Sequence, residues 1–219
     1  MKIINVADIR AEFKRLLVNE CYVVDKSGVN TLEIIACTFL ADEISIFGSI
    51  NEDYVRRELD WYNSQSLNVN DISGKIPEIW KVVSDKDGFI NSNYGYLIHS
   101  TANNNQYQNV LNELRINKNS RRASMIYTRP SIWLDYSKNG MSDFICTHAV
   151  DYLIRNEKLH AHVIMRSNDA FYGYRNDRYW QAHVQKQLAD ELHVGVGNLL
   201  WTVSSLHVYS RHFELLSKS

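Results

Sequence analysis

The chain has 219 residues, a formal net charge of -1 and a hydrophobic fraction of 45%. No compositional break divides it, so we expect a single domain over residues 1–219 that buries a sizeable core. A chain without excess positive charge has no bulk attraction for nucleic-acid polymers. The composition therefore argues against direct binding to DNA or RNA.

The cysteines and the ends of the chain predict where the protein acts. Cys21, Cys37 and Cys146 are odd in number and far apart, and the sequence shows neither a basic and apolar leader nor a long apolar span. These features predict a reduced, cytoplasmic compartment and no membrane contact. There is no CxxC, no HExxH and no carboxylate cluster with ligand spacing, so we expect no metal.

The N-terminal part predicts a helix followed by two strands. Apolar residues recur with helical period over residues 6–19, and Asp8 lies in the first turn. Two apolar and β-branched runs follow at 21–25 and 31–40, and the polar residues 26–30 separate them. This pattern is typical of strand, turn and strand.

The central part predicts helices at 52–64, 76–83 and 106–114, because apolar residues recur there with a period near 3.6. A polar loop at 117–122 then precedes a predicted strand at 124–128. We expect these helices to flank a sheet.

The C-terminal part alternates between strand and helix patterns. It predicts strands at 143–154, 159–165 and 199–203, and a buried helix at 178–192. The charged residues 155–158 between the first two strands indicate a hairpin turn.

Arginines before and after one cysteine carry the strongest chemical signal. Arg121 and Arg122 precede Cys146, and Arg166 with Ser167 follows it, all within about fifty residues. Guanidinium groups bind phosphate bidentately, and a thiolate is a strong nucleophile. The combination indicates an enzyme that holds a nucleotide monophosphate and attacks its base with sulfur. Taken singly, the cysteine is more often a packing residue in a strand and the arginines are more often solvated.

Short motifs occur in an order that resembles one enzyme family. They are ELDW at 58–61, IW at 79–80, NYG at 93–95, SRR at 120–122, Cys146, RSND at 166–169 with Gly173, and HVYSRH at 207–212. The ordered set resembles the thymidylate synthase superfamily, and within it the deoxycytidylate hydroxymethylases of T-even bacteriophages. The resemblance covers about residues 23–212. It implies an α/β (α+β) fold with a mixed twisted sheet flanked by helices, and a dimer formed through the sheet.

The resemblance implies covalent catalysis by Cys146. In this family the cysteine adds to C6 of a pyrimidine, and C5 then takes a one-carbon unit from 5,10-methylenetetrahydrofolate. Glu58 matches the glutamate that organises water and proton transfers, and Tyr94 matches a tyrosine near the cysteine. A solvated glutamate and a packed core tyrosine are the ordinary alternatives.

The resemblance also assigns the phosphate site. Lys26, Arg166 and Ser167 would bind phosphate from one subunit, and Arg121 and Arg122 would reach across from the other. The homodimer would therefore be part of the active site.

Sugar and folate contacts are implied for four further residues. His207 and Tyr209 match residues that hold the sugar hydroxyl. Trp80 and Asp169 match positions beside the folate, where an aromatic face stacks and a carboxylate accepts hydrogen bonds from the pterin. Packing or capping is the alternative for all four.

Asp177 is the residue that would select the base. It falls where uracil-specific members of the family carry asparagine, and a carboxyl group matches the N4 donor and N3 acceptor of cytosine. A mismatched base would leave buried polar groups unsatisfied, at roughly 1 to 3 kcal/mol each. The alternative is that Asp177 caps a helix that starts near Arg178.

The resemblance favours hydration of the transferred carbon over its reduction. The expected activity is conversion of dCMP to 5-hydroxymethyl-dCMP, in a bacteriophage-infected host, for modified viral DNA. A dCMP or dUMP C5-methyltransferase and a catalytically silent nucleotide-binding protein are the alternatives.

Overall fold

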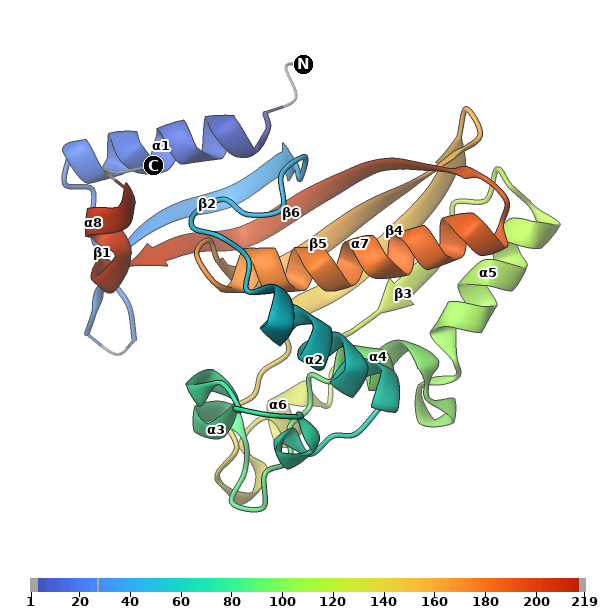
Figure 1. Ribbon diagram of the computed structural model, residues 1–219, viewed down its shortest axis with the longest axis horizontal. Coiled ribbons are helices and arrows are strands. Elements are labelled where there is room, and N and C mark those ends of the chain that lie inside the picture. Colours follow the sequence, from blue (N-terminus) through green and yellow to red (C-terminus); the bar gives the residue numbers. More distant parts are fainter. Residues whose placement is uncertain (1–3, 27, 217–219) are drawn as a thin grey trace. The chain divides into compact units, whose positions relative to one another are not determined.

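The computed structural model describes residues 4–26 and 28–216. They form two compact units, each with its own strands and helices. Unit 1 comprises the described residues up to Ile50 and from Arg155, and unit 2 is Asn51–Ile154. Figure 1 shows the elements of both units with the labels used below.

The sheet of unit 1 mixes parallel and antiparallel strands. Its strands are β1 (Val23–Val24), β2 (Asn30–Leu40), β5 (Lys158–Asp169) and β6 (Gly195–Tyr209), in the order β1-β2-β6-β5. β2 is antiparallel to β1 and β6, whereas β5 is parallel to β6. The predicted mixed sheet is confirmed. Residue Ser27, in the predicted turn between the first two strands, lies outside the described residues.

β6 is much longer than the predicted strand at 199–203. It spans fifteen residues, because Ser205 pairs with Ile35 on one side and with Ser167 on the other. Polar serines interrupt the apolar pattern there, but backbone pairing on both sides keeps the strand continuous.

α1 (Val6–Val18) confirms the helix predicted at 6–19, and it packs on β2. Asn5 caps it, since its side chain accepts the N–H of Asp8 at 3.1 Å while the Asp8 carboxylate accepts the N–H of Asn5 at 3.0 Å. Val6, Ile9 and Phe13 are its buried residues. The described residues end with a 3₁₀ turn, η4 (Ser210–His212), and α8 (Phe213–Leu216).

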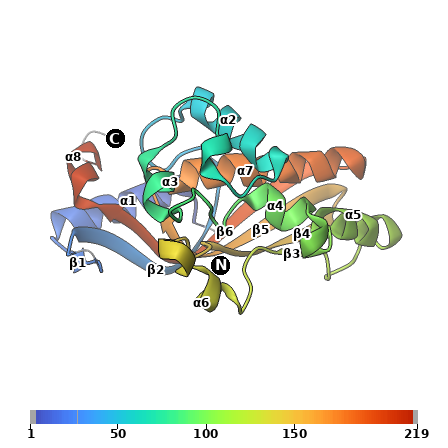
Figure 2. The same cartoon turned by 90° about the horizontal axis from the view of Figure 1, so that it is seen from below.

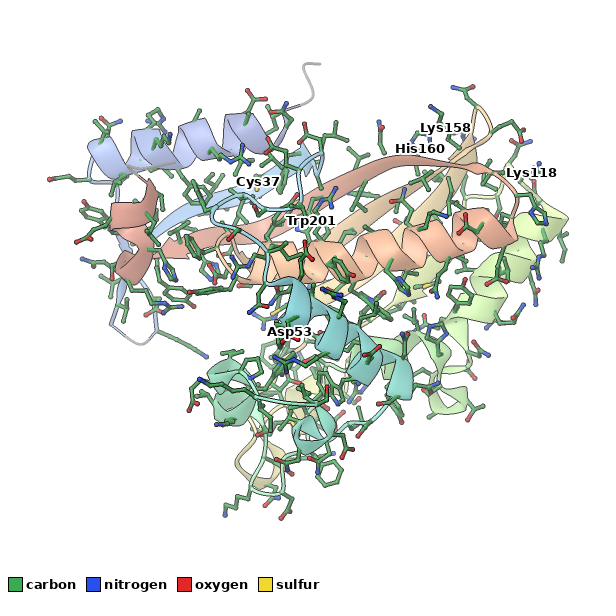
Figure 3. All side chains as sticks on the ribbon, viewed as in Figure 1. Cys37, Asp53, Lys118, Lys158, His160 and Trp201 are labelled. Atoms are coloured by element: carbon green, nitrogen blue, oxygen red, sulfur yellow. The ribbon has the colours of Figure 1, made fainter. Side chains whose placement is uncertain are left out.

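α7 (Gly173–Glu191) lies along β5 and β6, as Figure 1 and Figure 2 both show. Trp201 of β6, labelled in Figure 3, is fully buried and meets the ring of Tyr174 edge-on at 5.4 Å. The helix begins at Gly173, before the predicted Arg178, and the Asp169 carboxylate accepts the N–H groups of Phe171 and Tyr172 in the turn that precedes it.

The alternation of inward-facing and outward-facing residues is interrupted at one line across three strands. Ala36, Ser204 and Arg166 lie opposite one another at this line, between residue pairs that keep the same backbone register on both sides. Ala36 has a positive φ of 53°, a conformation that an L-residue adopts only at a cost. Before this line the buried residues of β5 and β6 are odd-numbered, and beyond it they are even-numbered, beginning with Asn168 and Leu206.

Unit 2 is built mainly from helices. They are α2 (Glu52–Ser64), α3 (Glu78–Val83), α4 (Tyr94–His99), α5 (Gln106–Ile116) and α6 (Ile132–Asp135), with 3₁₀ turns η1 (Val69–Asp71), η2 (Thr101–Asn103) and η3 (Lys138–Gly140). The predicted helices at 52–64, 76–83 and 106–114 are confirmed. α4 escaped prediction because six residues are too few to reveal a period.

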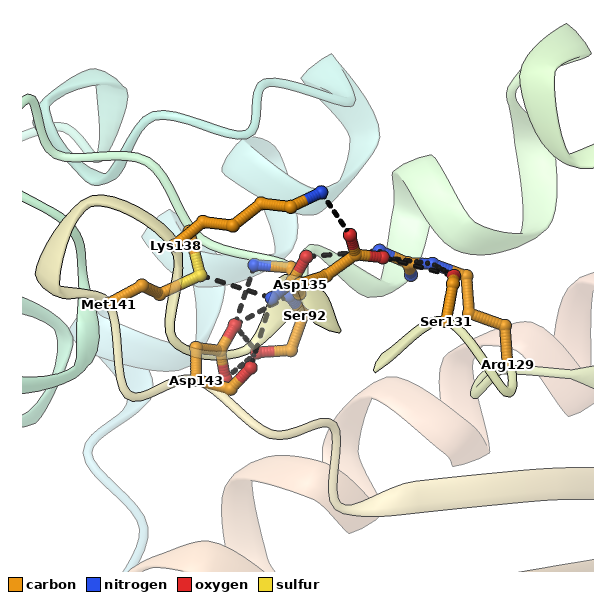
Figure 4. A network of polar contacts seen from close by, with 8 residues as sticks. Ser92, Arg129, Ser131, Asp135, Lys138, Met141 and Asp143 are labelled. Carbon is orange, nitrogen blue, oxygen red and sulfur yellow. Dashed lines mark hydrogen bonds and ion pairs between the residues drawn. The ribbon is translucent and has the colours of Figure 1, made fainter. Parts of the chain in front are cut away.

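The strands of unit 2, β3 (Ser124–Ile126) and β4 (Thr147–Arg155), pair antiparallel. The prediction that a strand starts at residue 143 is wrong. Asp143 is buried, and its carboxylate accepts hydrogen bonds from the N–H and the hydroxyl of Ser92. The segment that begins at residue 143 is therefore a loop that packs against the loop of Ser92. Figure 4 shows this contact. The turn after β4 has positive φ at Asn156 and Glu157, as in the tight turns of hairpins.

A second carboxylate holds the neighbouring loop of unit 2. Asp135 accepts hydrogen bonds from Lys138 at 2.5 Å, from Ser131 at 3.0 Å and from Arg129 at 2.9 Å (Figure 4). The Lys138 bond is the largest of the effects that lower the pKa of Asp135 to about 2. The carboxylate is therefore ionised throughout the physiological range.

We predict that Gly95→Ala strongly destabilises unit 2. A Cβ at this position would overlap the backbone carbonyl of Tyr62, because α4 and α2 approach closely there. We expect a loss of roughly 3 kcal/mol in the free energy of unfolding, measured in urea. Gly195→Ala is the control, since its Cβ would make only ordinary contacts at 3.4 Å or more. Equal effects of the two changes would contradict the close approach.

Candidate active site

Cys146 is the thiol best placed to act as a nucleophile. It is half-buried directly before β4, with its Sγ 3.8 Å from the carbonyl oxygen of Phe144. The prediction that it lies inside a strand is wrong by one residue. Cys37, by contrast, is buried in β2, and burial raises the pKa of its thiol to about 11. A thiol with that pKa is almost entirely protonated at neutral pH and is a poor nucleophile.

Tyr94 is tied to the residue that follows the cysteine. The hydroxyl of Thr147 donates to the hydroxyl oxygen of Tyr94 at 2.9 Å, and both groups are buried. The ring of Tyr94 stacks on Tyr62 at 5.3 Å and meets Tyr127 edge-on at 5.2 Å. The structure therefore places Tyr94 beside the segment that carries Cys146.

Glu58 is a buried carboxyl group and not part of a solvated helix face. It is 5% exposed, and its Oε1 accepts hydrogen bonds from the Tyr54 hydroxyl and, at 3.3 Å, from the Trp80 indole. Burial raises its pKa to about 7, although both hydrogen bonds act in the opposite direction. A group with such a pKa can take up and release protons near neutral pH.

Trp80 uses its indole nitrogen inside unit 2. Its N–H also donates to the Tyr54 hydroxyl at 2.8 Å, and Trp61 meets its ring edge-on at 5.2 Å. The side chain is half-buried. Only its aromatic surface is therefore left to contact a folate.

The interrupted alternation in unit 1 gathers the candidate phosphate and sugar residues. It turns Ser167 and Asp169 of β5 to the same side as Arg166, and it turns His207 and Tyr209 of β6 to that side too; all five are half-buried. Asp169 lies directly opposite His207, and the rings of His207 and Tyr209 are 5.0 Å apart.

Lys26 lies near the same end of this sheet. Lys26 is exposed in the turn between β1 and β2. Shortly after that turn, Thr31 of β2 pairs with Tyr209 of β6, so the turn lies close to the Tyr209 end of β6.

Asp177 lies one turn inside α7, so the alternative that it caps the helix is wrong. Its Oδ2 accepts the side-chain N–H of Asn168 at 2.7 Å. Gly173 leaves room for this contact, since a Cβ there would lie 3.1 Å from Asn168 Nδ2 and 3.8 Å from Asp177 Oδ2. Asn168 is buried, and sequence reasoning named it only as part of a motif.

Asp169 combines two possible roles. Its oxygens accept the N–H groups of Phe171 and Tyr172, which is the capping alternative weighed above. A carboxylate has about four acceptor sites, so it retains capacity for donors of a ligand.

Arg121 and Arg122 are exposed beside α5 in unit 2. Arg122 pairs with Glu113 at 3.1 Å, and Ser120 donates to the same oxygen at 2.5 Å. The hydrogen bond from Ser120, and then that from Arg122, hold the pKa of Glu113 below its usual value. Within one chain the arginine pair is surface charge, as an isolated pair usually is.

Two further properties concern the described part of the chain. No helix in it combines the length and the apolar character needed to cross a membrane. Nor do three or more His, Cys, Asp or Glu side chains gather there as a metal site requires.

We predict a pH-dependent stability difference between the wild type and Glu58→Gln. Because the pKa of Glu58 is about 7 in the folded state and 4.5 ordinarily, the folded state loses relative stability as pH rises from 4.5 to 7. Glutamine does not titrate, so the variant should gain roughly 3 kcal/mol over the wild type across this window. Urea unfolding at several pH values measures this gain, and exposed Glu52→Gln on the same helix is the control. A difference that stays constant with pH would contradict a buried, protonated Glu58.

Comparison with known proteins identifies the family. Residues 47–219 match the family described as thymidylate synthase. Deoxycytidylate 5-hydroxymethyltransferase of Enterobacteria phage T4 is 51% identical over 218 residues, covering 96% of this chain and 89% of the phage protein. A thymidylate synthase of Fusobacterium nucleatum is 31% identical over 166 residues, covering 73% of this chain and 58% of that protein.

A solved structure shows the same fold. Thermostable thymidylate synthase A from Bacillus subtilis superposes with a TM-score of 0.73 and 22% identity, covering 98% of this chain and 83% of that one. Together, the matched residues, the identities and the shared fold show that this chain belongs to the thymidylate synthase family.

Proposed function

We propose that the protein is a deoxycytidylate 5-hydroxymethyltransferase, which converts dCMP to 5-hydroxymethyl-dCMP. The observation that carries this proposal is the 51% identity, over 96% of the chain, to the phage T4 protein of that name. The phage T2 and T6 proteins of the same name are equally similar. We further propose that it acts in the cytoplasm of an infected host and supplies modified viral DNA.

Cys146 is the proposed nucleophile. Its thiolate would add to C6 of cytosine, which makes C5 electron-rich enough to form a carbon–carbon bond. Glu58 would exchange protons near the base, since its pKa of about 7 allows both states at neutral pH. Tyr94 would order the segment that follows the cysteine through Thr147.

5,10-Methylenetetrahydrofolate would supply the one-carbon unit, which water then converts to a hydroxymethyl group. Two residues suit it chemically. The half-buried Trp80 has an aromatic surface left for stacking, and Asp169 retains acceptor capacity for pterin N–H donors.

Phosphate recognition would combine residues of two subunits. Arg166, Ser167 and Lys26 would bind the phosphate in one protomer, and Arg121 and Arg122 would come from its partner. Two observations support this arrangement: Arg166 and Ser167 share one half-buried face of the unit 1 sheet, and the arginine pair is exposed. His207 and Tyr209, on the same face, would hold the sugar hydroxyl.

A dimer formed through the sheet suits the exposure of its strands. Ile35 of β2 is 74% exposed in the single chain, and the outward residues Ile164 and Leu200 are half-buried. Since the proposed roles draw on both units, we propose that residues 1–219 act as one catalytic domain.

The direct test of function is product mass. The purified protein is incubated with dCMP or dUMP and 5,10-methylenetetrahydrofolate, and tritium release from C5 is followed. We expect tritium release from dCMP and a product heavier by one CH₂O unit. A gain of one CH₂ unit would identify a methyltransferase instead, and absence of tritium release with both nucleotides would identify a silent nucleotide-binding protein.

Cys146→Ser should abolish this reaction, with a loss of at least roughly a thousandfold in kcat, because a hydroxyl is a much weaker nucleophile than a thiolate. Steady-state tritium release measures the loss. Cys21→Ser, at an exposed cysteine after α1, is the control and should retain full activity. Retained activity of Cys146→Ser would refute the covalent mechanism.

Asp177→Asn should shift the base preference from cytosine toward uracil. An amide mismatches the donor and acceptor of cytosine, and two unsatisfied groups at roughly 1 to 3 kcal/mol each predict a fall of about a hundredfold or more in kcat/KM for dCMP. Competition between dCMP and dUMP measures the preference. Asp190→Asn, in an exposed pair with Lys186 on the same helix, is the control. An unchanged preference would show that Asp177 does not read the base.

A further inference from the structure

Tyr54 belongs to a hydrogen-bonded group whose other members, Glu58 and Trp80, the sequence already singled out. Tyr54 and Glu58 are four residues apart on α2 and therefore lie on one face of the helix. Trp80 comes from α3 and reaches both of them. The sequence pattern alone shows Tyr54 only as one of the apolar positions of the helix.

The chemistry of the three groups fixes the direction of each hydrogen bond. An indole N–H can only donate, so the Tyr54 oxygen accepts from Trp80 at 2.8 Å. A carboxylate can only accept, so the Tyr54 proton points at Oε1 of Glu58. The chain of donors therefore runs in one direction, from Trp80 to Tyr54 to Glu58.

This polarity distinguishes the two oxygens of Glu58. The bonds from Tyr54 and Trp80 both end on Oε1, and Oε2 accepts neither of them. If Glu58 were protonated on Oε1, that proton and the Tyr54 proton would face each other and one donor would lose its acceptor. Protonation on Oε2 keeps every bond intact.

Neighbouring side chains hold this group in place. Trp61 meets the Trp80 ring edge-on, and its own N–H donates to the carbonyl oxygen of Asn68 at 3.0 Å. Arg57 lies over the Tyr54 ring at 5.6 Å and is anchored at 2.9 Å to Asp53. Tyr54 is thus supported on its ring face and at its hydroxyl.

Tyr54 is a permanent donor. Burial, and then the nearby charge of Glu58, raise the pKa of Tyr54 well above its usual value, so its proton does not leave. Few other charged groups surround the pair: Arg57 lies on the same helix, and Glu78 and Lys81 on α3 are exposed and pair with each other at 3.6 Å. On α4, the helix packed against α2, the titratable residues are Tyr94, Tyr96 and His99, and the ring of Tyr94 lies on Tyr62.

We propose that Tyr54 is a positioning residue that locks Oε1 of Glu58, so that Glu58 takes up and releases its proton at Oε2 alone. The kinetic part of this inference rests on the proposed function, in which Glu58 exchanges protons at the base. The structural part of the inference is that the Glu58 carboxyl group has a fixed orientation and that only Oε1 accepts these two hydrogen bonds. This part is independent of the proposed function. A free carboxyl group would rotate and present either oxygen, whereas the locked one presents a single oxygen in a fixed direction.

Tyr54→Phe tests the proposal by removing one hydroxyl and keeping the ring under Arg57. Without this donor the ionised form of Glu58 loses a hydrogen bond, so we expect the pKa of Glu58 to rise by roughly one unit. Carbon-13 NMR of glutamate-labelled protein measures it, and the Glu58 signal is assigned by its loss in Glu58→Gln. This readout needs no catalytic activity.

The kinetic readouts of the same variant are the pH profile and the separation of kcat from KM. We expect kcat to fall about tenfold to a hundredfold, KM for dCMP to change less than about threefold, and the pH profile to move in parallel with the NMR titration. Tyr174→Phe is the matched control, because it removes another buried hydroxyl, which donates to the carbonyl oxygen of Glu43 at 2.9 Å. It should leave the Glu58 titration and kcat unchanged.

A second change keeps the test decisive if Tyr54→Phe fails to fold. Replacement of Tyr54 by 3,5-difluorotyrosine makes the phenol a stronger donor, so the pKa of Glu58 should fall instead of rise. An unmoved Glu58 titration in either variant, or shifts of the wrong sign, would overturn the proposal. If the titration shifts as expected but the wild type releases no tritium from dCMP, the proposed function fails and the positioning role stands.

Discussion

The organisation of unit 1 depends on a constraint in its sheet: backbone pairing must continue while the side chains change direction. Ala36, Ser204 and Arg166 lie on one line across β2, β6 and β5, between residue pairs that keep the same backbone register on either side. A break in one strand alone would put its neighbours out of register, since the side-chain period of a strand is two. Because the breaks align, the strands turn their side chains together and pairing resumes on the far side.

Because of this aligned break, neighbouring polar residues lie on the same face of the sheet, which is impossible in a regular strand. In an uninterrupted β5, Arg166 and Ser167 would point to opposite faces of the sheet. The interrupted alternation brings them to one half-buried face, together with Asp169, His207 and Tyr209. The cost is borne by Ala36, whose positive φ is unfavourable for a residue with a Cβ. Backbone strain that accompanies a cluster of polar side chains is typical of binding sites.

The main feature of unit 2 is a buried carboxyl group, that of Glu58. Water is withdrawn from Glu58, and the two donors on Oε1 only partly offset that loss, so its pKa remains near 7. An apolar residue at position 54 or at position 80 would remove one of these two donors and leave the buried carboxyl with the other alone. The buried side of α2 therefore combines apolar and polar residues: Val55, Trp61 and Tyr62 pack the interior, and Glu58 forms a polar pair with Tyr54 beside them.

The sequence by itself determined most of the helices, the mixed character of the sheet and the family. Helical periodicity located α1, α2, α3 and α5 closely, and the ordered motifs predicted membership of the thymidylate synthase family, which the comparisons confirm. Local propensity and spacing suffice for the helices and the motifs, because each depends on residues close together in the chain. The mixed sheet was implied by the family resemblance and not by any local pattern.

Only the tertiary structure decided where several of these elements begin and end, and what the polar residues contact. The extent of β6 depends on pairing with two other strands, and the state of Glu58 depends on Trp80, which is 22 positions away. Sequence patterns record which side chains favour burial, but the burial of one carboxyl, and the donor that meets it, are set by residues that come together only when the chain folds.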